Sequence, residues 1–176
     1  MDDRRITLRR LTDANRKNIL ALHVAPTQER FVGSVAGALQ DAEEHPEAKP
    51  WSRAVYAGEE PVGFVMLSWD CTPQPPEIIG PWFLWKLLID EHHRRYGYGS
   101  EVVREVGELV RAAGAAELLT SHLPDDDQGP GPFYAQLGFV PTGERDVNGE
   151  IILRLHLRGF RSVSERVLER TNDVAA

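Results

Sequence analysis

The chain has 176 residues, 41% of them hydrophobic, and a formal net charge of −7 at pH 7. This length suffices for one domain with a buried core, and the acidic excess argues against general nucleic-acid binding. Cys71 is the single cysteine, so no internal disulfide can form and a reducing compartment is expected. The N-terminus lacks the apolar core of a signal peptide, and the stretch Ile78–Ile89 is too short and interrupted to span a bilayer. We therefore expect a soluble, cytoplasmic protein with no membrane or nucleic-acid partner.

The first half of the chain predicts one strand, two helices and then three strands. Alternation in residues 5–10 indicates the first strand, and a helix is expected to begin at Thr12 or Asp13. A second, uninterrupted helix is predicted from Thr27 to the region of Pro46. The β-rich runs 52–58 and 61–69 meet at a hairpin signal, and the apolar run 82–90 is typical of a central strand buried on both faces.

The second half predicts a long helix, a strand, a short helix and a hairpin. Residues 99–113 place an apolar stripe on one helical face, which ends at Gly114. A strand at 115–122 and a short helix at 132–137 follow, and Asn148-Gly149 indicates a final hairpin turn.

The element order is therefore β-α-α-β-β-β-α-β-α-β-β. It predicts an α/β fold, with a mixed, mostly antiparallel sheet of about seven strands and helices on both faces. Residues 1–158 are expected to form a single domain, and residues 159–176 a C-terminal tail that is a short helix or frayed.

The stretch HHRRYGYGSE, residues 92–101, lies between the predicted central strand and the predicted long helix. The N-terminus of a helix has unpaired backbone N–H groups and the positive end of the helix dipole. Gly97 and Gly99 lack a Cβ, so an anion can approach the backbone closely, and Arg94 and Arg95 add positive charge beside it. The stretch therefore predicts an anion-binding site, such as one for the pyrophosphate of a coenzyme.

Three glycine-rich anion-binding motifs can be compared with this stretch. A Walker loop requires Lys and then Ser or Thr after its last glycine, whereas Ser100 and Glu101 follow Gly99. The dinucleotide fingerprint requires a third glycine where Val102 stands, and an opening strand-helix-strand unit that is absent from the predicted elements. The third motif, R-x-x-G-x-G from Arg94, resembles the acetyl-CoA-binding motif of the GNAT (Gcn5-related) N-acetyltransferase superfamily. A glycine-rich turn with solvated arginines is the alternative interpretation.

A second segment extends this resemblance. FYAQLGF, Phe133–Phe139, is similar to the helix-to-strand segment F/L-Y-x-x-x-G-F of the same family, and the two segments stand in the family's order. Further segments between residues 5 and 157 resemble the branch of diamine and spermine/spermidine acetyltransferases. The resemblance implies the GNAT fold, acetyl-CoA as cosubstrate and a polyamine-like amine as acceptor.

Two positions depart from the family pattern. Many relatives have glycine and a basic residue where this chain has Arg95 and Tyr96, so we expect a stiffer loop and an altered coenzyme affinity. The loop before the tyrosine helix reads DDDQGPGP, so the asparagine contact that relatives often make there has no counterpart. Asp125–Asp127 in this loop are either solvated or attract a polyamine.

The resemblance implies roles for individual residues. Leu88 and Ile89 would offer backbone groups to the pantetheine arm of the coenzyme, with the Ile89 N–H polarising the thioester carbonyl, while their side chains pack in the core. Tyr134 would be the general acid that protonates the leaving thiolate, a task suited to a phenol of pKa about 10, or else an aromatic packing residue. Gln28, Glu29 and Phe31 would cover the acceptor pocket. The residues expected to bind the coenzyme are Leu88, Ile89, Arg94, Arg95, Tyr96, Gly97, Tyr98, Gly99 and Ser100.

The general base is left open. A primary ammonium of pKa about 10.4 is neutral in only about one part in a thousand at pH 7, so a base, a water chain or a desolvating pocket must assist. Glu77 is the first candidate, and Asp70, His122 and Glu144 are rivals. Each of the four also fits a solvated loop residue.

We expect an N-acetyltransferase that transfers acetyl from acetyl-CoA to a small primary amine by direct attack in a ternary complex. Cys71 has no evident histidine partner and is not needed as a nucleophile. His92 and His93 are adjacent and lack a metal-binding partner motif, so no metal is expected. The alternatives are an acetyltransferase for an antibiotic, another amine metabolite or a protein N-terminus, or a non-catalytic acyl-CoA-binding module. A homodimer is left open.

Overall fold

The structure is a computed structural model that describes residues 5–124 and 129–158. The predicted tail at 159–176 and the acidic loop Asp125–Asp127 lie outside the described residues. The helices and strands are β1 Ile6–Arg9, α1 Asp13–Leu20, α2 Glu29–Val32, α3 Val35–Glu44, β2 Pro50–Ala57, β3 Glu60–Ser68, β4 Phe83–Ile89, α4 Tyr98–Ala112, β5 Glu117–His122, α5 Gly131–Gln136, β6 Val140–Arg145 and β7 Ile151–His156.

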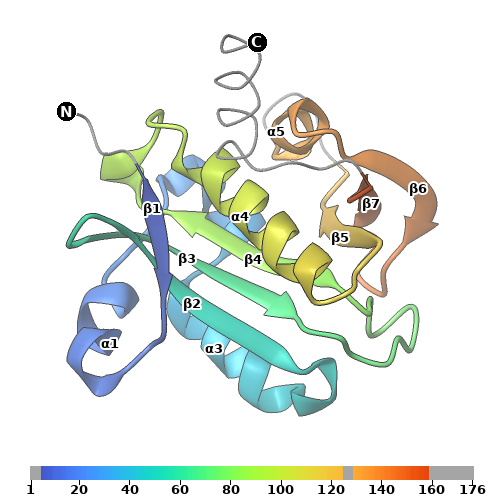
Figure 1. The fold of residues 1–176 in the computed structure, drawn as a ribbon, viewed down its shortest axis with the longest axis horizontal. Coiled ribbons are helices and arrows are strands. Elements are labelled where there is room, and N and C mark those ends of the chain that lie inside the picture. The colour runs from blue at the N-terminus through green and yellow to red at the C-terminus, as the bar shows by residue number, and fades with distance from the viewer. Residues whose placement is uncertain (1–4, 125–128, 159–176) are drawn as a thin grey trace, which may run out of the picture.

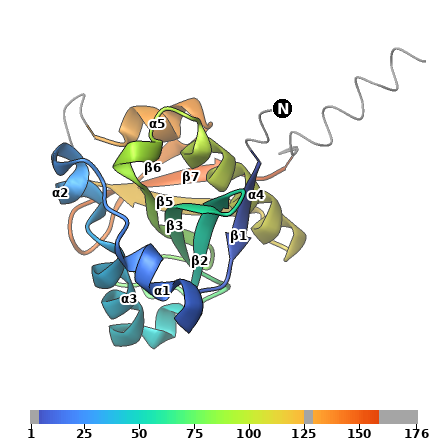
Figure 2. The ribbon, with the colours of Figure 1, turned by 90° about the vertical axis from the view of Figure 1, so that its left-hand side faces the viewer.

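All of these strands belong to one seven-stranded sheet with the order β1-β2-β3-β4-β5-β7-β6. The pair β4 and β5 is parallel, and the other neighbouring strands are antiparallel. Helices α1 and α3 cover one face of the sheet, and α4 crosses the other (Figures 1 and 2). The predicted mixed sheet of about seven strands with helices on both faces is confirmed.

The predicted second helix is wrong in one respect, because the chain forms two helices there. Gly33 adopts a left-handed φ of 69° and ends α2, and Ser34 then begins α3 by accepting a 3.0 Å hydrogen bond from the Gly37 N–H. A glycine after the last helical residue and a serine N-cap are the usual signals of such a break. The break turns the chain so that α2 lies beside the end of β4.

Strand β3 separates two hydrophobic cores. Val65 and Leu67 pack under α4, against its buried valines, whereas Phe64 and Met66 pack under α1 and α3. Alternate residues of a strand point to opposite faces, so both faces of β3 are apolar because both are covered by helices.

Strand β4 contains a bulge that the sequence pattern does not reveal. Met66 of β3 pairs with Lys86 and Leu67 pairs with Leu84, so Trp85 is an extra residue on β4. Leu84 and Leu88 are four positions apart, so in a regular strand they would face the same side of the sheet. Because of the bulge, Leu84 packs under α4 and Leu88 packs in the opposite core. After the bulge, Leu87 and Ile89 face the α4 side of the sheet.

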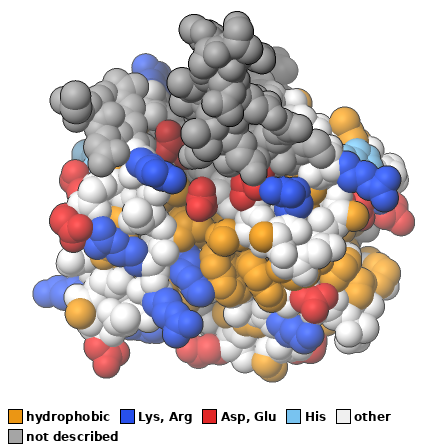
Figure 3. Space-filling model, viewed as in Figure 1, with side chains coloured by type: hydrophobic (Ala, Val, Ile, Leu, Met, Phe, Trp, Pro, Cys, Tyr) orange, Lys and Arg blue, Asp and Glu red, His pale blue; other side chains and the backbone are white. Residues whose placement is uncertain are grey.

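The face that carries α4 shows scattered charges of both signs around a central patch of hydrophobic side chains (Figure 3). None of the helices within residues 5–124 and 129–158 is long and apolar enough to cross a membrane.

Candidate active site

Strands β4 and β5 diverge after a short parallel contact. They pair only at Phe83 with Leu119 and at Leu84 with Thr120. The Thr120 Oγ1 hydroxyl donates a 2.9 Å hydrogen bond to the Leu84 carbonyl at the last paired position. Beyond it, the facing edges of both strands are open, so a slender ligand with amide groups can form hydrogen bonds to the backbone there.

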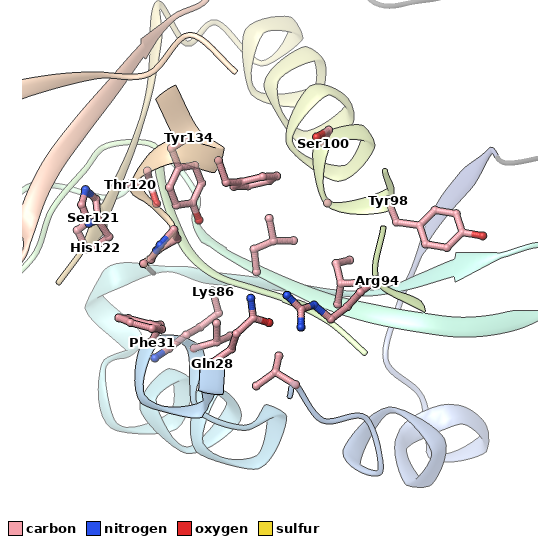
Figure 4. A pocket seen from close by; sticks show the side chains of 18 of the residues that line it. Gln28, Phe31, Lys86, Arg94, Tyr98, Ser100, Thr120, Ser121, His122 and Tyr134 are labelled. Carbon is pink, nitrogen blue, oxygen red and sulfur yellow. The ribbon is translucent and has the colours of Figure 1, made fainter. Parts of the chain in front are cut away.

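A first cavity of about 450 Å³ lies at this opening. The side chains of Tyr134 and Thr120 form one wall, Arg94 and Ser100 lie near the start of α4, and Gln28 approaches from the opposite side (Figure 4). The other predicted site residues that line this cavity are Phe31, Ile89, Arg95, Gly97, Tyr98 and Gly99.

The start of α4 forms one end of the first cavity. Gly97 is the N-cap residue, with a left-handed φ of 83° and no capping side chain. The N–H groups of the first helical turn lack intrahelical acceptors and can bind an anion. A Cβ on Gly99 would lie 3.4 Å from the Phe133 ring, so a larger side chain there would extend into the space between α4 and α5. The geometry fits a pyrophosphate group.

Arg95 has a left-handed φ of 69°, which is unusual for a residue with a side chain. The resemblance to the family pattern implies glycine at this position. Arg95, which departs from the family pattern, is therefore also a point of backbone strain. The usual difference between left- and right-handed conformations makes this strain about 1–2 kcal/mol.

Of the residues predicted to bind the coenzyme or to cover the acceptor pocket, three do not line the first cavity. Leu88 is buried in the core beneath α1 and α3, Tyr96 is exposed and stacks on Tyr98 at 5.7 Å, and Glu29 is exposed at the start of α2. The backbone near Leu88 is tightly held, because a Cβ on Gly63 would clash with the Leu88 carbonyl oxygen. Gly63 fixes the end of β4, and sequence reasoning missed it.

Tyr134 is almost fully buried, with 8% of its surface exposed. Burial raises the pKa of its phenol to about 12; a hydrogen bond with Thr120 opposes this shift, and the charge of Glu150 adds to it. A phenol of raised pKa stays protonated at neutral pH but gives up its proton less readily.

A second cavity of about 610 Å³ adjoins the first. The two cavities share the lining residues Phe31, Trp85, Lys86 and Ser121. Charged residues are mostly acidic in the second cavity, where the carboxylates are those of Asp41, Glu47, Glu77, Asp146 and Glu150. Lys86 is the basic residue of its lining, and its Nζ lies 3.6 Å from Asp41 Oδ2.

Ser121 and Glu150 meet where the two cavities join. The Ser121 hydroxyl donates a 2.5 Å hydrogen bond to Glu150 Oε2. Ser121 is near the end of β5, and Glu150 directly precedes β7, the antiparallel neighbour of β5. Sequence reasoning missed both residues; the only signal was the position of Glu150 next to the Asn148-Gly149 turn.

The candidate bases occupy different places. Glu77 is exposed and lines the second cavity, whereas His122 lines the first. His122 Nδ1 lies 2.7 Å from the Leu123 carbonyl, which can only accept, so Nδ1 carries the proton and Nε2 is a potential acceptor. Glu144 lines a smaller cavity, and Asp70 lines none of these three cavities.

Histidines surround a buried carboxylate at the end of β4. Asp90 accepts hydrogen bonds from the backbone N–H groups of His23 and His92, and its Oδ1 lies 3.1 Å from His92 Nδ1. Burial raises the pKa of Asp90, but these hydrogen bonds outweigh burial, so the pKa is lowered.

Within the described part of the chain, no group of three or more His, Cys, Asp or Glu residues is arranged to hold a metal ion.

Comparison with known proteins agrees with this architecture. Residues 50–141 match the acetyltransferase (GNAT) domain family model. The spermine/spermidine N(1)-acetyltransferase of Bacillus subtilis strain 168 is 26% identical over 148 residues, which are 84% of this chain and 96% of that protein.

Two solved structures share the fold. An aminoglycoside acetyltransferase in complex with coenzyme A has a TM-score of 0.67 at 16% identity, covering 89% of this chain and 97% of that one. The PaiA N-acetyltransferase of Thermoplasma acidophilum, also in complex with coenzyme A, has a TM-score of 0.58 at 13% identity, covering 86% and 99%. Since the family model spans more than half of the chain and the fold agrees, the chain belongs to the GNAT acetyltransferase family.

Proposed function

We propose that this acetyltransferase acts on a primary amine of a small polycation, such as a diamine or polyamine, by direct attack in a ternary complex. Its family makes acetyl-CoA the acetyl donor. The observation that carries the acceptor class is the acidic second cavity, which adjoins the cavity at the start of α4.

The acidic lining suits a substrate with more than one positive charge. One amine must lie near the residues that line both cavities, where it can attack the acetyl group. A second cation of the same substrate can then remain among the carboxylates of the second cavity. Glu77 and Glu47 are exposed at the rim of the second cavity, so their contacts with an ammonium group would be screened by water and salt. Broad specificity that weakens with ionic strength is the expected behaviour. The similarity to a spermine/spermidine acetyltransferase points the same way.

The first cavity would hold the coenzyme. The start of α4, with Gly97, Gly99 and Ser100, would bind the pyrophosphate with help from Arg94. The open edge of β4 at Ile89 would bind the pantetheine arm. Tyr134 would protonate the leaving thiolate, since its hydroxyl borders the same cavity.

An aminoglycoside is a second candidate acceptor, because it too carries several amines and because the chain shares its fold with an aminoglycoside acetyltransferase. A thiol-release assay separates the two classes. Spermidine or a diamine should exceed a monoamine of matched length in kcat/KM, and the advantage should shrink as salt is added. If the monoamine performs equally well, or if only the aminoglycoside turns over, the polyamine assignment fails while the acetyltransferase assignment stands. The cytoplasmic location and the homodimer stay predictions.

A further inference from the structure

We propose that Ser121 and Glu150 together take the proton from the ammonium group of the acceptor. The inference rests on the proposed function, because it requires an amine acceptor in the second cavity. It assigns the base that the sequence left open, and it replaces the first candidate, Glu77.

Position is the first argument. Ser121 is one of the residues that line both cavities, so it lies where the proposed coenzyme site and the proposed amine site meet. Glu150 lines the second cavity and is half-buried. Its charge also reaches Tyr134, whose pKa it helps to raise after the larger effect of burial. The pair therefore lies close to the expected general acid.

The direction of the hydrogen bond is the second argument. Ser121 donates its hydroxyl proton to Glu150 Oε2, so the lone pairs of the serine oxygen are free to accept a proton from another donor. An ammonium N–H is such a donor. A hydroxyl alone is a poor base, but one already bonded to a carboxylate can pass a proton on as it receives one.

The proton transfers balance as follows. The ammonium gives one proton to Ser121 Oγ while the serine proton moves to Glu150, which becomes neutral. The neutral amine then attacks the thioester carbonyl, so that a C–N bond forms and the C–S bond breaks. One of the two protons still on the attacking nitrogen replaces the proton that Tyr134 gives to the thiolate, and the other stays on the amide nitrogen. Glu150 later releases its proton to water, and the products are an amide, a thiol and one proton.

Lys86 supports this step from the other side of the junction. It lines both cavities, and a cation near an ammonium lowers the pKa of that ammonium. Its pairing with Asp41 at 3.6 Å reduces this effect without removing it. The remaining titratable groups that share the second cavity with Glu150 are Asp146 from the same turn, Glu77 from the loop before β4, and His45 and Glu47 from the segment after α3.

The other candidates lack this combination. Glu77 is exposed in the second cavity and does not line the first, and His122 lines the first cavity but not the second. Asp146 lines the second cavity, but its Oδ1 accepts the backbone N–H groups of Asn148 and Glu150 and so holds the turn.

The experiment compares two acceptors in wild-type enzyme and in Glu150→Gln and Ser121→Ala variants. One acceptor is a strongly basic diamine, and the other is a weakly basic amine, such as trifluoroethylamine, that is largely neutral at the assay pH. A base contributes typically about 10²–10⁴-fold, so kcat with the diamine should fall by that factor in Glu150→Gln. With the weakly basic amine, it should fall by less than about threefold, because no proton has to be removed before attack.

The pH profile provides an independent measurement. In the Glu150→Gln variant, kcat with the diamine should rise about tenfold per pH unit between pH 7 and 9, in step with the neutral fraction of the amine. Glu144→Gln removes a carboxylate that lines neither the first nor the second cavity, and should leave the ratio of kcat for the two acceptors unchanged. Titration calorimetry should give unchanged acetyl-CoA affinity for Glu150→Gln and Glu144→Gln, because neither residue lines the first cavity.

Equal losses with both acceptors would show that Glu150 only supports the turn, and an unchanged kcat with the diamine would show that the proton leaves by another route. Either result overturns the proposal. Any strongly basic amine that wild-type enzyme acetylates serves for this test, so a failure of the polyamine assignment appears separately, as the wrong order of acceptors in the wild-type panel.

Discussion

The two cavities differ in what lines them. In the first cavity, the stretch 89–100 supplies eight of the 23 lining residues and offers backbone N–H groups, an open strand edge and arginines. The second collects carboxylates from α3, the loop before β4 and the turn between β6 and β7. Backbone recognition fixes the shape and charge of a constant donor, whereas separate surface side chains can change one by one. The difference suggests why this fold can keep one donor and accept different amines.

The largest expected effect concerns Tyr134 in the wall of the first cavity. Tyr134→Phe keeps the ring and removes the hydroxyl, so kcat should fall by about 10²–10⁴-fold while acetyl-CoA affinity, measured by calorimetry, stays nearly intact. Because burial raises the pKa of Tyr134 to about 12, ionisation of this residue should cause no fall in wild-type kcat as pH rises to 10. A kcat within twofold of wild type would make Tyr134 a packing residue and water the acid.

The next effect concerns the first cavity alone. Gly99→Val places carbons beside Phe133 and should weaken acetyl-CoA binding by at least about tenfold, which is about 1.4 kcal/mol. Gly99→Ala adds only a Cβ in ordinary contact at 3.4 Å and should weaken binding less. Calorimetric titration measures both. If the folded valine variant binds as tightly as wild type, the pyrophosphate lies elsewhere.

A smaller effect is expected for the second cavity. Glu77→Gln removes one carboxylate from the exposed rim, so KM for a diamine should rise by about two- to fivefold with kcat unchanged. The change should disappear at high salt. Glu144→Gln is the matched control, because Glu144 lines neither the first nor the second cavity. An equal rise in both variants would mean that net charge, not the cavity, attracts the substrate.

The smallest effect concerns backbone strain in the first cavity. Arg95→Gly relieves a left-handed φ of 69° and should raise the free energy of unfolding by about 0.5–1 kcal/mol, since the greater chain entropy of glycine offsets part of the relief. Arg94→Gly is the control, because Arg94 has an ordinary φ of −70° and should lose stability. Urea denaturation measures both. A destabilised Arg95→Gly variant would mean that the guanidinium contributes more than the strain.

The same comparison explains what the sequence could predict. The strands, the long helix and the turn at Gly97 before α4 are determined by residues close together in the chain. Local sequence patterns therefore predict them. The break at Gly33-Ser34 was also encoded locally, but the apolar pattern on either side outweighed it in the prediction.

Pairing between distant segments was beyond the sequence. The bulge at Trp85 exists only relative to β3, and the contact between Ser121 and Glu150 exists only because β5 and β7 are neighbours. No spacing in the chain relates residues that are 29 positions apart. The sequence therefore led to Glu77 as the first candidate base, whereas the Ser121 and Glu150 pair that we propose gave no signal along the chain.

The bulge at Trp85 has a consequence for how this gene can vary. One extra residue on β4 sets which side of the sheet Leu87 and Ile89 face, and Ile89 is part of the first cavity. Loss of one residue between Leu84 and Ile89 would only remove the bulge, because the remaining residues can pair with β3 in regular alternation and keep their faces. Insertion of one residue there would exchange the faces of every residue downstream to the end of the strand, unless a second bulge formed. Descendants of this gene should therefore tolerate replacements in this strand, and the loss of one residue, more readily than insertions.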